Sequence, residues 1–229
     1  DIVTVQPYYL GYRHDSSTVK DAVNALDLHN AGLRGYGVVG HTGFDYDGNI
    51  VYQFGRSSGR QQTSALAYDL ELGYTLETRP WQPRVSAFYG YGSGDRNPYD
   101  QTNQTFNPLF GFNQPWSRND YFSWDNVHAP KFRIEMSPTK DLKVDTGYNA
   151  YWLASDQAAW KRASLQDKTG QSGSFLGHEW DIRFRYKWNS RIESDFSYSW
   201  FTPGEMPSRL GKNQDSHFLY LQLSFNAFK

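Results

Sequence analysis

Large apolar or aromatic residues alternate with charged residues over long stretches of this chain. From Glu179 to Lys187 every odd position is charged, and every even position from Trp180 to Trp188 is large and apolar or aromatic. The alternation resumes after a turn at 189–190. A period of two residues places one set of side chains on each face of a β-strand. The pattern therefore predicts a sheet with one charged face and one apolar face.

About ten segments show this alternation between turn residues. Most of them have about ten residues or more, whereas strands of globular proteins usually have about five or six. A tilted strand that crosses a bilayer needs about 9–11 residues. The lengths therefore favour membrane-spanning strands. The segments cover roughly residues 2–14, 30–42, 44–56, 63–77, 82–93, 128–137, 141–154, 174–188, 191–202 and 216–228.

The connections between these segments alternate in length. Short turns contain GFDYDG, ETRPWQPR, SPTKDL and KWNSR, and the longer loops are rich in Asp, Asn, Ser, Gly and Gln. This pattern is typical of an antiparallel up-and-down transmembrane β-barrel of the outer membrane. We therefore expect an all-β fold and one barrel domain over residues 1–229. Its longer outer loops are expected at about 15–29, 57–62, 94–127, 155–173 and 203–215.

A soluble β-sandwich or a lipocalin-like barrel is the alternative, because these folds also alternate, with apolar residues in the core. Composition favours the membrane. Aromatic residues make up 17% of the chain, with 17 Tyr, 15 Phe and 8 Trp, although the mean hydropathy is only -0.75. Tyr and Trp favour the membrane interface, and Trp152, Trp188 and Trp200 lie near expected strand ends. We expect apolar side chains to face lipid and charged side chains to face water or one another.

Other features exclude several classes of protein. The chain has no Cys, so it has no disulfide framework and no thiolate metal site. The net charge of -1 gives no sign of nucleic-acid binding. No run of 18 apolar residues predicts a transmembrane helix, and the six His have no paired metal spacing. The chain opens on a strand-like segment without a signal peptide, so we expect a mature chain or a fragment. We also expect no cofactor.

Several short motifs stand in order along nearly the whole chain. They are FDYDGNIVYQFG at 44–55, Ser93-Gly94-Asp95, Asp100, Thr105 to Phe110, Asp120, WDNVHAP at 124–130, SPTKDL at 137–142, WFTPG at 200–204, and the aromatic end at Phe225 and Phe228. In this order and spacing they resemble the alginate-export-type outer-membrane porin family.

The resemblance implies a monomeric barrel of about eighteen strands in the outer membrane of a Gram-negative bacterium. It also implies contact with the lipid bilayer and lipopolysaccharide, and conduction of anionic polysaccharide or other solutes. Because this chain shows about ten strands, we expect either the C-terminal part of such a barrel or a shortened relative.

The charged face supplies the candidate pore lining, and its basic and acidic residues are nearly balanced. Salt-bridged ladders that only satisfy a polar interior are one interpretation. A basic wall that selects anions is the other, because rings of basic side chains do this in pores. The candidates are Arg84, Lys131, Arg133, Lys143, Asp145, Glu179, Asp181, Arg183, Arg185, Glu193 and Asp195.

Hairpin geometry predicts which of these charges lie opposite one another. Turns centred on Asn189 and Thr139 would place opposite charges directly across the hairpins, where each pair contributes about 0.2–1 kcal/mol. The expected pairs are Arg185 with Glu193, Arg183 with Asp195, Glu135 with Lys143, and Arg133 with Asp145.

The long loop after Ser93 is expected at the outer mouth. Asp95, Arg96 and Asp100 could gate entry there or bind a cation. The alternative is a loop stabilised by Asx turns, in which Asp side chains bond nearby backbone N–H groups.

Catalysis is a further alternative, because small outer-membrane barrels include proteases and lipases. Asp95, Asp120 and His128 would be the protease candidates, and Ser174 with His178 the lipase pair. Neither set carries a recognisable local motif, so we expect no enzyme. A non-conducting structural or adhesive barrel is the third class. The sequence favours a passive channel for hydrophilic, anionic, polysaccharide-like solutes.

Overall fold

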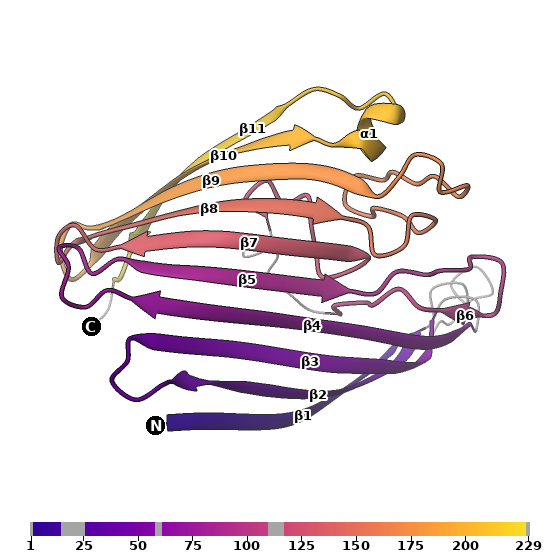
Figure 1. Ribbon diagram of the computed structural model, residues 1–229, viewed down its shortest axis with the longest axis horizontal. Helices are drawn as coiled ribbons and strands as arrows, with labels where there is room; N and C mark the ends of the chain where they lie inside the picture. Colours follow the sequence, from indigo (N-terminus) through magenta and orange to yellow (C-terminus); the bar gives the residue numbers. More distant parts are fainter. Residues whose placement is uncertain (1, 15–25, 58–60, 110–116, 228–229) are drawn as a thin grey trace.

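The computed structural model describes residues 2–14, 26–57, 61–109 and 117–227, and these form one antiparallel sheet with almost no helix (Figure 1). Ten of its eleven strands follow the path β1-β2-β3-β4-β5-β7-β8-β9-β10-β11, and the short β6 pairs in parallel with β4. This confirms the predicted antiparallel meander. The elements are β1 (Ile2–His14), β2 (Leu26–Val38), β3 (Phe44–Arg56), β4 (Gln62–Thr75), β5 (Arg84–Gly92), β6 (Thr102–Asn103), β7 (Val127–Met136), β8 (Leu142–Trp152), β9 (Phe175–Lys187), β10 (Ile192–Pro203), α1 (Glu205–Arg209) and β11 (Ser216–Phe225).

Some predicted boundaries were wrong. The second strand runs from Leu26 to Val38 rather than over 30–42, because Leu26 already pairs with His14 of β1. The Ser57 N–H donates to the carbonyl of Gln61 (2.9 Å), and residues 58–60 of the loop expected at 57–62 lie outside the described residues. Parts of the expected loops, and two residues of the quoted motifs, lie outside the described residues: 15–25, 110–116, Phe110 and Phe228.

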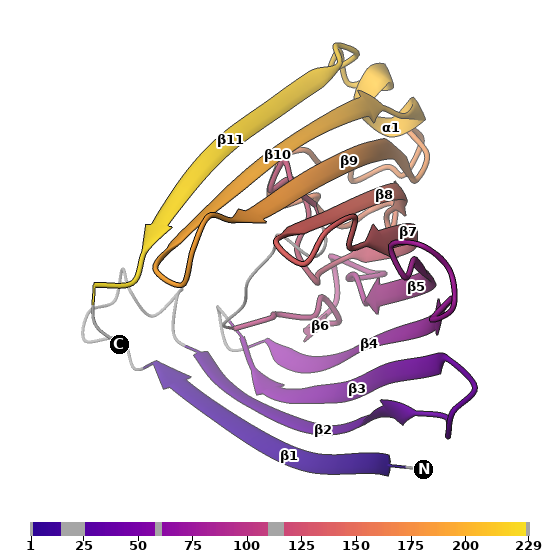
Figure 2. The same ribbon diagram turned by 90° about the vertical axis from the view of Figure 1, so that its left-hand side faces the viewer.

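The sheet is strongly curved and open. Figure 2, which looks onto the end with the short turns, shows the strands wrapping around a concave side. In the described part of the chain, β1 and β11 are edges that each pair with one strand. The start of β1 and the end of β11 both lie at the short-turn end, because they pair with Val38 and Ile192 beside the turns there. The longer loops lie at the opposite end (Figure 1).

The two faces differ as the alternation predicts. On the convex face, Leu70, Leu221 and Trp180 keep exposed fractions of 57%, 65% and 39%. On the concave face, Asp181 is only 2% exposed. Apolar side chains therefore cover the outside of the curve, and charged side chains its inside. No helix of the described residues is long and apolar enough to cross a membrane.

The charged hairpins have a register two residues away from the predicted one. Lys187 lies opposite Glu193 in β9–β10, and Glu135 lies opposite Asp145 in β7–β8. Asn189 Oδ1 accepts the N–H groups of the two residues that precede and begin β10, so Asn189 starts the turn instead of centring it. The Thr139 hydroxyl acts in the same way in the turn before β8. A shift of two residues keeps every side chain on its face.

Candidate functional site

The described parts of the loop between β5 and β7, residues 93–109 and 117–126, lie against the concave face of the sheet (Figure 2), and we call them the inner loop. Its first half packs over β2 to β4. The side chain of Gln53, fully buried in β3, donates to the carbonyl of Asn107 (2.8 Å) and accepts from the Asn107 N–H (2.9 Å). Phe106 packs with Val51 and Ala65 beside it. The inner loop is therefore tied to the sheet by paired hydrogen bonds and by apolar contact.

The second half of the inner loop is held by one carboxylate. Glu179 of β9 has no exposed surface. Its two oxygens accept hydrogen bonds from the Ser117 hydroxyl (2.7 Å), the Arg118 backbone N–H (2.7 Å) and the Asn119 side-chain amide (2.9 Å). Charge-assisted bonds of this kind are stronger than neutral ones. The Glu179 side chain thus fixes residues 117–119 against the middle of the sheet.

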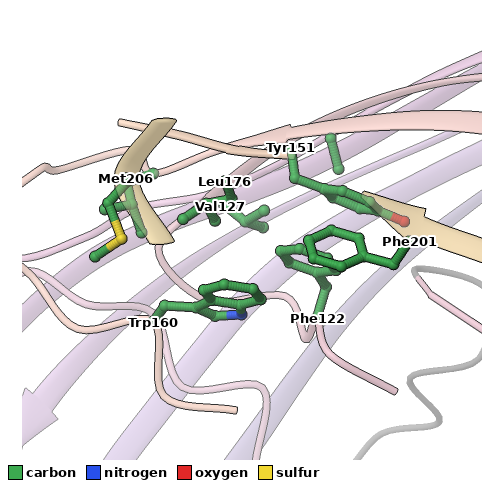
Figure 3. Close-up of a cluster of buried hydrophobic side chains, with 9 residues drawn as sticks. Phe122, Val127, Tyr151, Trp160, Leu176, Phe201 and Met206 are labelled. Atoms are coloured by element: carbon green, nitrogen blue, oxygen red, sulfur yellow. The ribbon is translucent and has the colours of Figure 1, made fainter. Parts of the chain in front are cut away.

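Aromatic packing anchors the same half toward the loop end. The Phe122 ring stacks on Tyr151 with centroids 3.6 Å apart and 9° between the planes, and Trp160 lies 5.0 Å from Phe122. Figure 3 shows Phe201 beside this stack. Asn126 joins the inner loop to the β8–β9 loop, because its Oδ1 accepts the Ser155 N–H (2.8 Å). The two loops therefore form one packed body on the concave face.

In the middle of the concave face, two buried carboxylates are surrounded by cationic side chains. Asp145 and Asp181 are nearly fully buried, at 1% and 2% exposure. Cations surround them, with N···O separations of 3.0 to 3.5 Å. These contacts are Arg133 Nη2 to Asp145 Oδ1 (3.0 Å), Arg185 Nη2 to Asp145 Oδ2 (3.4 Å), Arg118 Nη2 to Asp145 Oδ1 (3.5 Å) and Lys131 Nζ to Asp181 Oδ2 (3.5 Å).

A pocket of about 190 Å³ opens above these charges, and we call it the cation pocket. Four cationic side chains and one carboxylate line it, whereas Asp145 and Asp181 do not. A small anionic group in the pocket would lie beside these four cations, each of which also contacts a carboxylate. The lining residues are Glu71, Ser86, Phe88, Arg118, Lys131, Arg133 and Arg183.

Nearer the short turns, Arg84 lies within a group of carboxylates. Arg84 contacts three of them, with N···O separations of 2.5 Å to Asp45, 2.8 Å to Glu71 and 2.7 Å to Glu135. Arg34 pairs with Asp47 in the same region. Arg84 is therefore surrounded by carboxylates.

The remaining predicted pore residues also lie on the concave face. Arg183 binds Asp195, which also accepts a hydrogen bond from the Tyr220 hydroxyl (3.1 Å). Lys143 lines a second pocket, of about 250 Å³, near the short turns. Glu193 is exposed at the start of β10. The side chains predicted for one face thus share it, and their role in a pore stays a prediction.

The candidate residues at the outer mouth form local turns. Asp95 accepts the Asn97 N–H (3.2 Å) with its carboxylate, and Asp100 accepts the Thr102 N–H (2.7 Å) in the same way. Arg96 is exposed between them. These contacts match the Asx-turn interpretation. No group of three or more His, Asp or Glu residues in the described ranges could hold a metal ion.

The candidate catalytic residues make other contacts. The His128 ring shares a hydrogen bond with the Tyr89 hydroxyl (2.6 Å) on the convex face. Asp120 pairs instead with Arg162 (2.9 Å) in the β8–β9 loop. The His178 ring contacts Tyr148, also on the convex face. These histidines therefore face away from the inner loop that carries Asp95 and Asp120.

Sequence reasoning missed the contribution of Ser117, Arg118 and Asn119. These residues lie in a segment without periodicity, and Glu179 follows about sixty residues later. The one available signal was Arg118 itself, one of two cations in the polar loop at 93–126.

Comparison with known proteins yields one family. The family model described as alginate export matches residues 1–220, from the first strand into the last. Comparison with curated proteins finds no match.

Proposed function

We propose that the concave face of this chain, which belongs to the alginate export family of outer-membrane porins, forms one wall of a passive channel. The solutes would be hydrophilic and anionic, with acidic polysaccharide as the class that the family description suggests. Polysaccharide export is the activity of the family, and the preference for anions is our proposal.

The cation pocket is the observation that carries this proposal. Four of its lining residues are cations, and the carboxylates of Asp145 and Asp181, which pair with three of them, are buried and do not line the pocket. Arginine offers a planar set of donors that matches a carboxylate. A balanced count of charges can therefore still give a surface that attracts anions, as basic side chains do in selective pores.

The convex face supports a location in the membrane. Its exposed Leu, Phe, Tyr and Trp side chains would be stable against hydrocarbon. Unpaired backbone groups are costly there, so the edges at β1 and β11 would need partner strands. We propose that the described sheet is one wall of a larger closed barrel, in which more strands give a wider lumen.

The orientation follows from the loop lengths. Barrels of this class place short turns in the periplasm and longer loops outside. We therefore assign residues 93–126, 153–174 and 204–215 to the outer end of one barrel domain, near lipopolysaccharide. The fixed inner loop would narrow the path, so that solutes pass the cation pocket.

Planar-bilayer recordings test the channel. The protein should give open-channel currents, and reversal potentials in a salt gradient should show a preference for anions. The double variant Arg183→Glu and Arg185→Glu should weaken or invert this preference. Lys140→Glu with Lys168→Glu makes the same change of charge at exposed positions in two connecting segments and should leave it nearly unchanged.

Two results would contradict the proposal. Absence of open-channel current from the intact protein would favour a non-conducting structural or adhesive barrel. Unchanged selectivity in the double arginine variant would remove Arg183 and Arg185 from the selective surface. Incubation with peptide and phospholipid substrates would reveal a protease or lipase.

A further inference from the structure

Four histidines of the described strands lie on the convex face near the loop end, and each has a tyrosine beside it on the preceding strand. In three of these pairs the tyrosine hydroxyl lies within hydrogen-bond distance of the histidine Nδ1, at 2.5, 2.6 and 2.8 Å. In the fourth pair the ring centroids are 5.8 Å apart. We call these residues the tyrosine–histidine belt. The pairs are Tyr9 with His29, Tyr89 with His128, Tyr198 with His217, and Tyr148 with His178.

Each pair occupies the same place in its hairpin. The tyrosine lies two residues before the residue that is directly opposite the histidine, so the two rings are diagonal neighbours. Tyr89, for example, precedes Tyr91, which pairs with His128. The same geometry recurs in the β1–β2, β8–β9 and β10–β11 hairpins. The repetition indicates a continuous surface band rather than isolated contacts.

The four histidines also lie at one level around the curve. The hydrogen-bonded row through His128 reaches β2 at Leu33, four residues nearer the short turns than His29. Beyond β7, His178 lies two residues nearer the short turns than this row, and His217 lies two residues further. The position therefore moves by one residue for each strand. Tilted strands of a barrel are staggered in this way, so the belt follows the wall at nearly constant height.

The belt presents a nitrogen donor on the outside of the curve. When a tyrosine hydroxyl donates to Nδ1, the proton of the neutral imidazole lies on Nε2, which can donate to an anion. His217 is exposed, and His128 and His178 are half-buried. Tyrosine and tryptophan alone are sufficient for an aromatic belt at a membrane interface. The imidazoles therefore add a polar function that such a belt does not require.

Charged residues beside His29 strengthen this function. Arg13 and Arg56 are exposed and lie directly opposite Asp27 from either side, nearer the loop end than His29. The His29 Nε2 lies 3.4 Å from the Asp27 carboxylate. At the other edge of the sheet, the Asp215 carboxylate accepts an indole N–H (2.8 Å). Two guanidinium groups thus flank one carboxylate, which makes this part of the convex face complementary to an anion.

We propose that the tyrosine–histidine belt binds the phosphate groups of lipopolysaccharide in the outer leaflet. The apolar side chains nearer the middle of the strands would contact the acyl chains of the same molecule. The phosphates would then lie at the level of the Nε2 atoms and the two arginines. The inference rests on the proposed function, which places the loop end of the sheet outside.

Native mass spectrometry of the full chain released from detergent micelles tests the belt. The probes are lipid A with two phosphate groups and the same lipid after removal of both. We expect the phosphorylated lipid to bind more tightly. The triple variant His29→Phe, His128→Phe and His217→Phe keeps the rings but removes the nitrogen donors. It should weaken binding of the phosphorylated lipid about tenfold and leave the other lipid unchanged.

Two further variants control this result. His41→Phe makes the same change in an exposed turn at the opposite end of the sheet and should alter neither affinity. Replacing the three belt histidines with arginine should preserve binding, because a guanidinium group offers donors that match a phosphate. Loss of binding in both triple variants would overturn the role of the nitrogen donors, since the effect would then come from a disturbed wall.

Other results would also overturn the inference. Equal affinity of the intact protein for the two lipids would show that phosphate is not recognised. A phenylalanine triple variant that keeps the preference would place the phosphate contact elsewhere. Phosphatidylglycerol that binds as tightly as lipid A would exclude lipopolysaccharide as the specific partner.

Failure of the two proposals can be told apart, because binding in micelles needs no open channel. Phosphate-dependent binding without bilayer current would reject the channel and keep the belt. Anion-selective current together with equal binding of the two lipids would reject the belt and keep the channel.

Discussion

Replacing Glu179 with alanine should release the second half of the inner loop from the sheet. The change removes the acceptor of three hydrogen bonds, from the Ser117 hydroxyl, the Arg118 N–H and the Asn119 amide. The stack of Phe122 on Tyr151 remains and keeps the loop near the sheet. We therefore expect local opening of residues 117–119 rather than unfolding of the strands.

The magnitude follows from the burial of this carboxylate. Hydrogen bonds to a charged group contribute about 1.5–3 kcal/mol each, but the released donors regain water on the concave side. Removing one member of a buried charged network costs about 3–5 kcal/mol. We take a loss of about 3 kcal/mol in the free energy that holds the loop closed. Since about 1.4 kcal/mol corresponds to a factor of ten in an equilibrium constant, the open state becomes about 100-fold more populated.

Hydrogen exchange followed by mass spectrometry measures this opening. The segment 117–126 should exchange about 100-fold faster in Glu179→Ala, and bilayer recordings should show a larger, noisier conductance. Glu193→Ala removes an exposed carboxylate from the same face and should change neither readout. Unaltered protection of residues 117–119 in Glu179→Ala would refute the role given to this carboxylate.

Three further predictions concern the backbone, pH and salt. A β-carbon at Gly177 would lie 2.3 Å from a carbonyl oxygen of β10, at φ +137°. Gly177→Ala should therefore lower the free energy of unfolding by about 1–3 kcal/mol or more. Gly35→Ala is the control, because a β-carbon there meets no atom within 4 Å. Equal melting temperatures of the two variants would contradict this prediction. Hydrogen bonds from Thr169 and Ser172 hold the pKa of Asp167 well below its usual range. A lowered folded-state pKa gives stability that is present above the unfolded value of about 3.9 and is lost as pH falls through the folded value. In the unmodified protein, protection of residues 167–172 from hydrogen exchange should thus persist at pH 4. In Asp167→Asn this protection should be lost even at pH 7. Loss of protection near pH 4 in the unmodified protein would disprove the prediction. The anion preference should fall between 0.1 M and 1 M salt, as the Debye length shortens from about 10 Å to about 3 Å; a constant reversal-potential ratio would argue against an electrostatic origin.

The faces of the strands could be predicted because the alternation is local. Trp180 and Asp181 are neighbours in sequence, so a strand must place them on opposite faces. The alternation within a strand does not show which of its two faces other parts of the chain cover. Asp145 and Glu179 were assigned to the charged face, but their burial depends on the inner loop.

The registers of the hairpins could be predicted only in part. Opposite charges suggested turns centred on Asn189 and Thr139, whereas the side chains of these residues accept backbone N–H groups and begin the turns. Arg133 and Asp145 still meet at 3.0 Å, because long side chains reach a diagonal neighbour.

The order of strands in the sheet has a consequence for how such a wall can vary. Neighbours along the ten-strand path follow one another in the chain, with only β6 inserted, so the wall is modular. A hairpin added or removed at either rim would leave the other registers intact. The inner loop is different, because it joins Gln53 of β3 to Asn107 and Ser117 to Glu179 of β9. A related wall would therefore have to keep both β3 and β9 for the two described halves of the loop to stay attached.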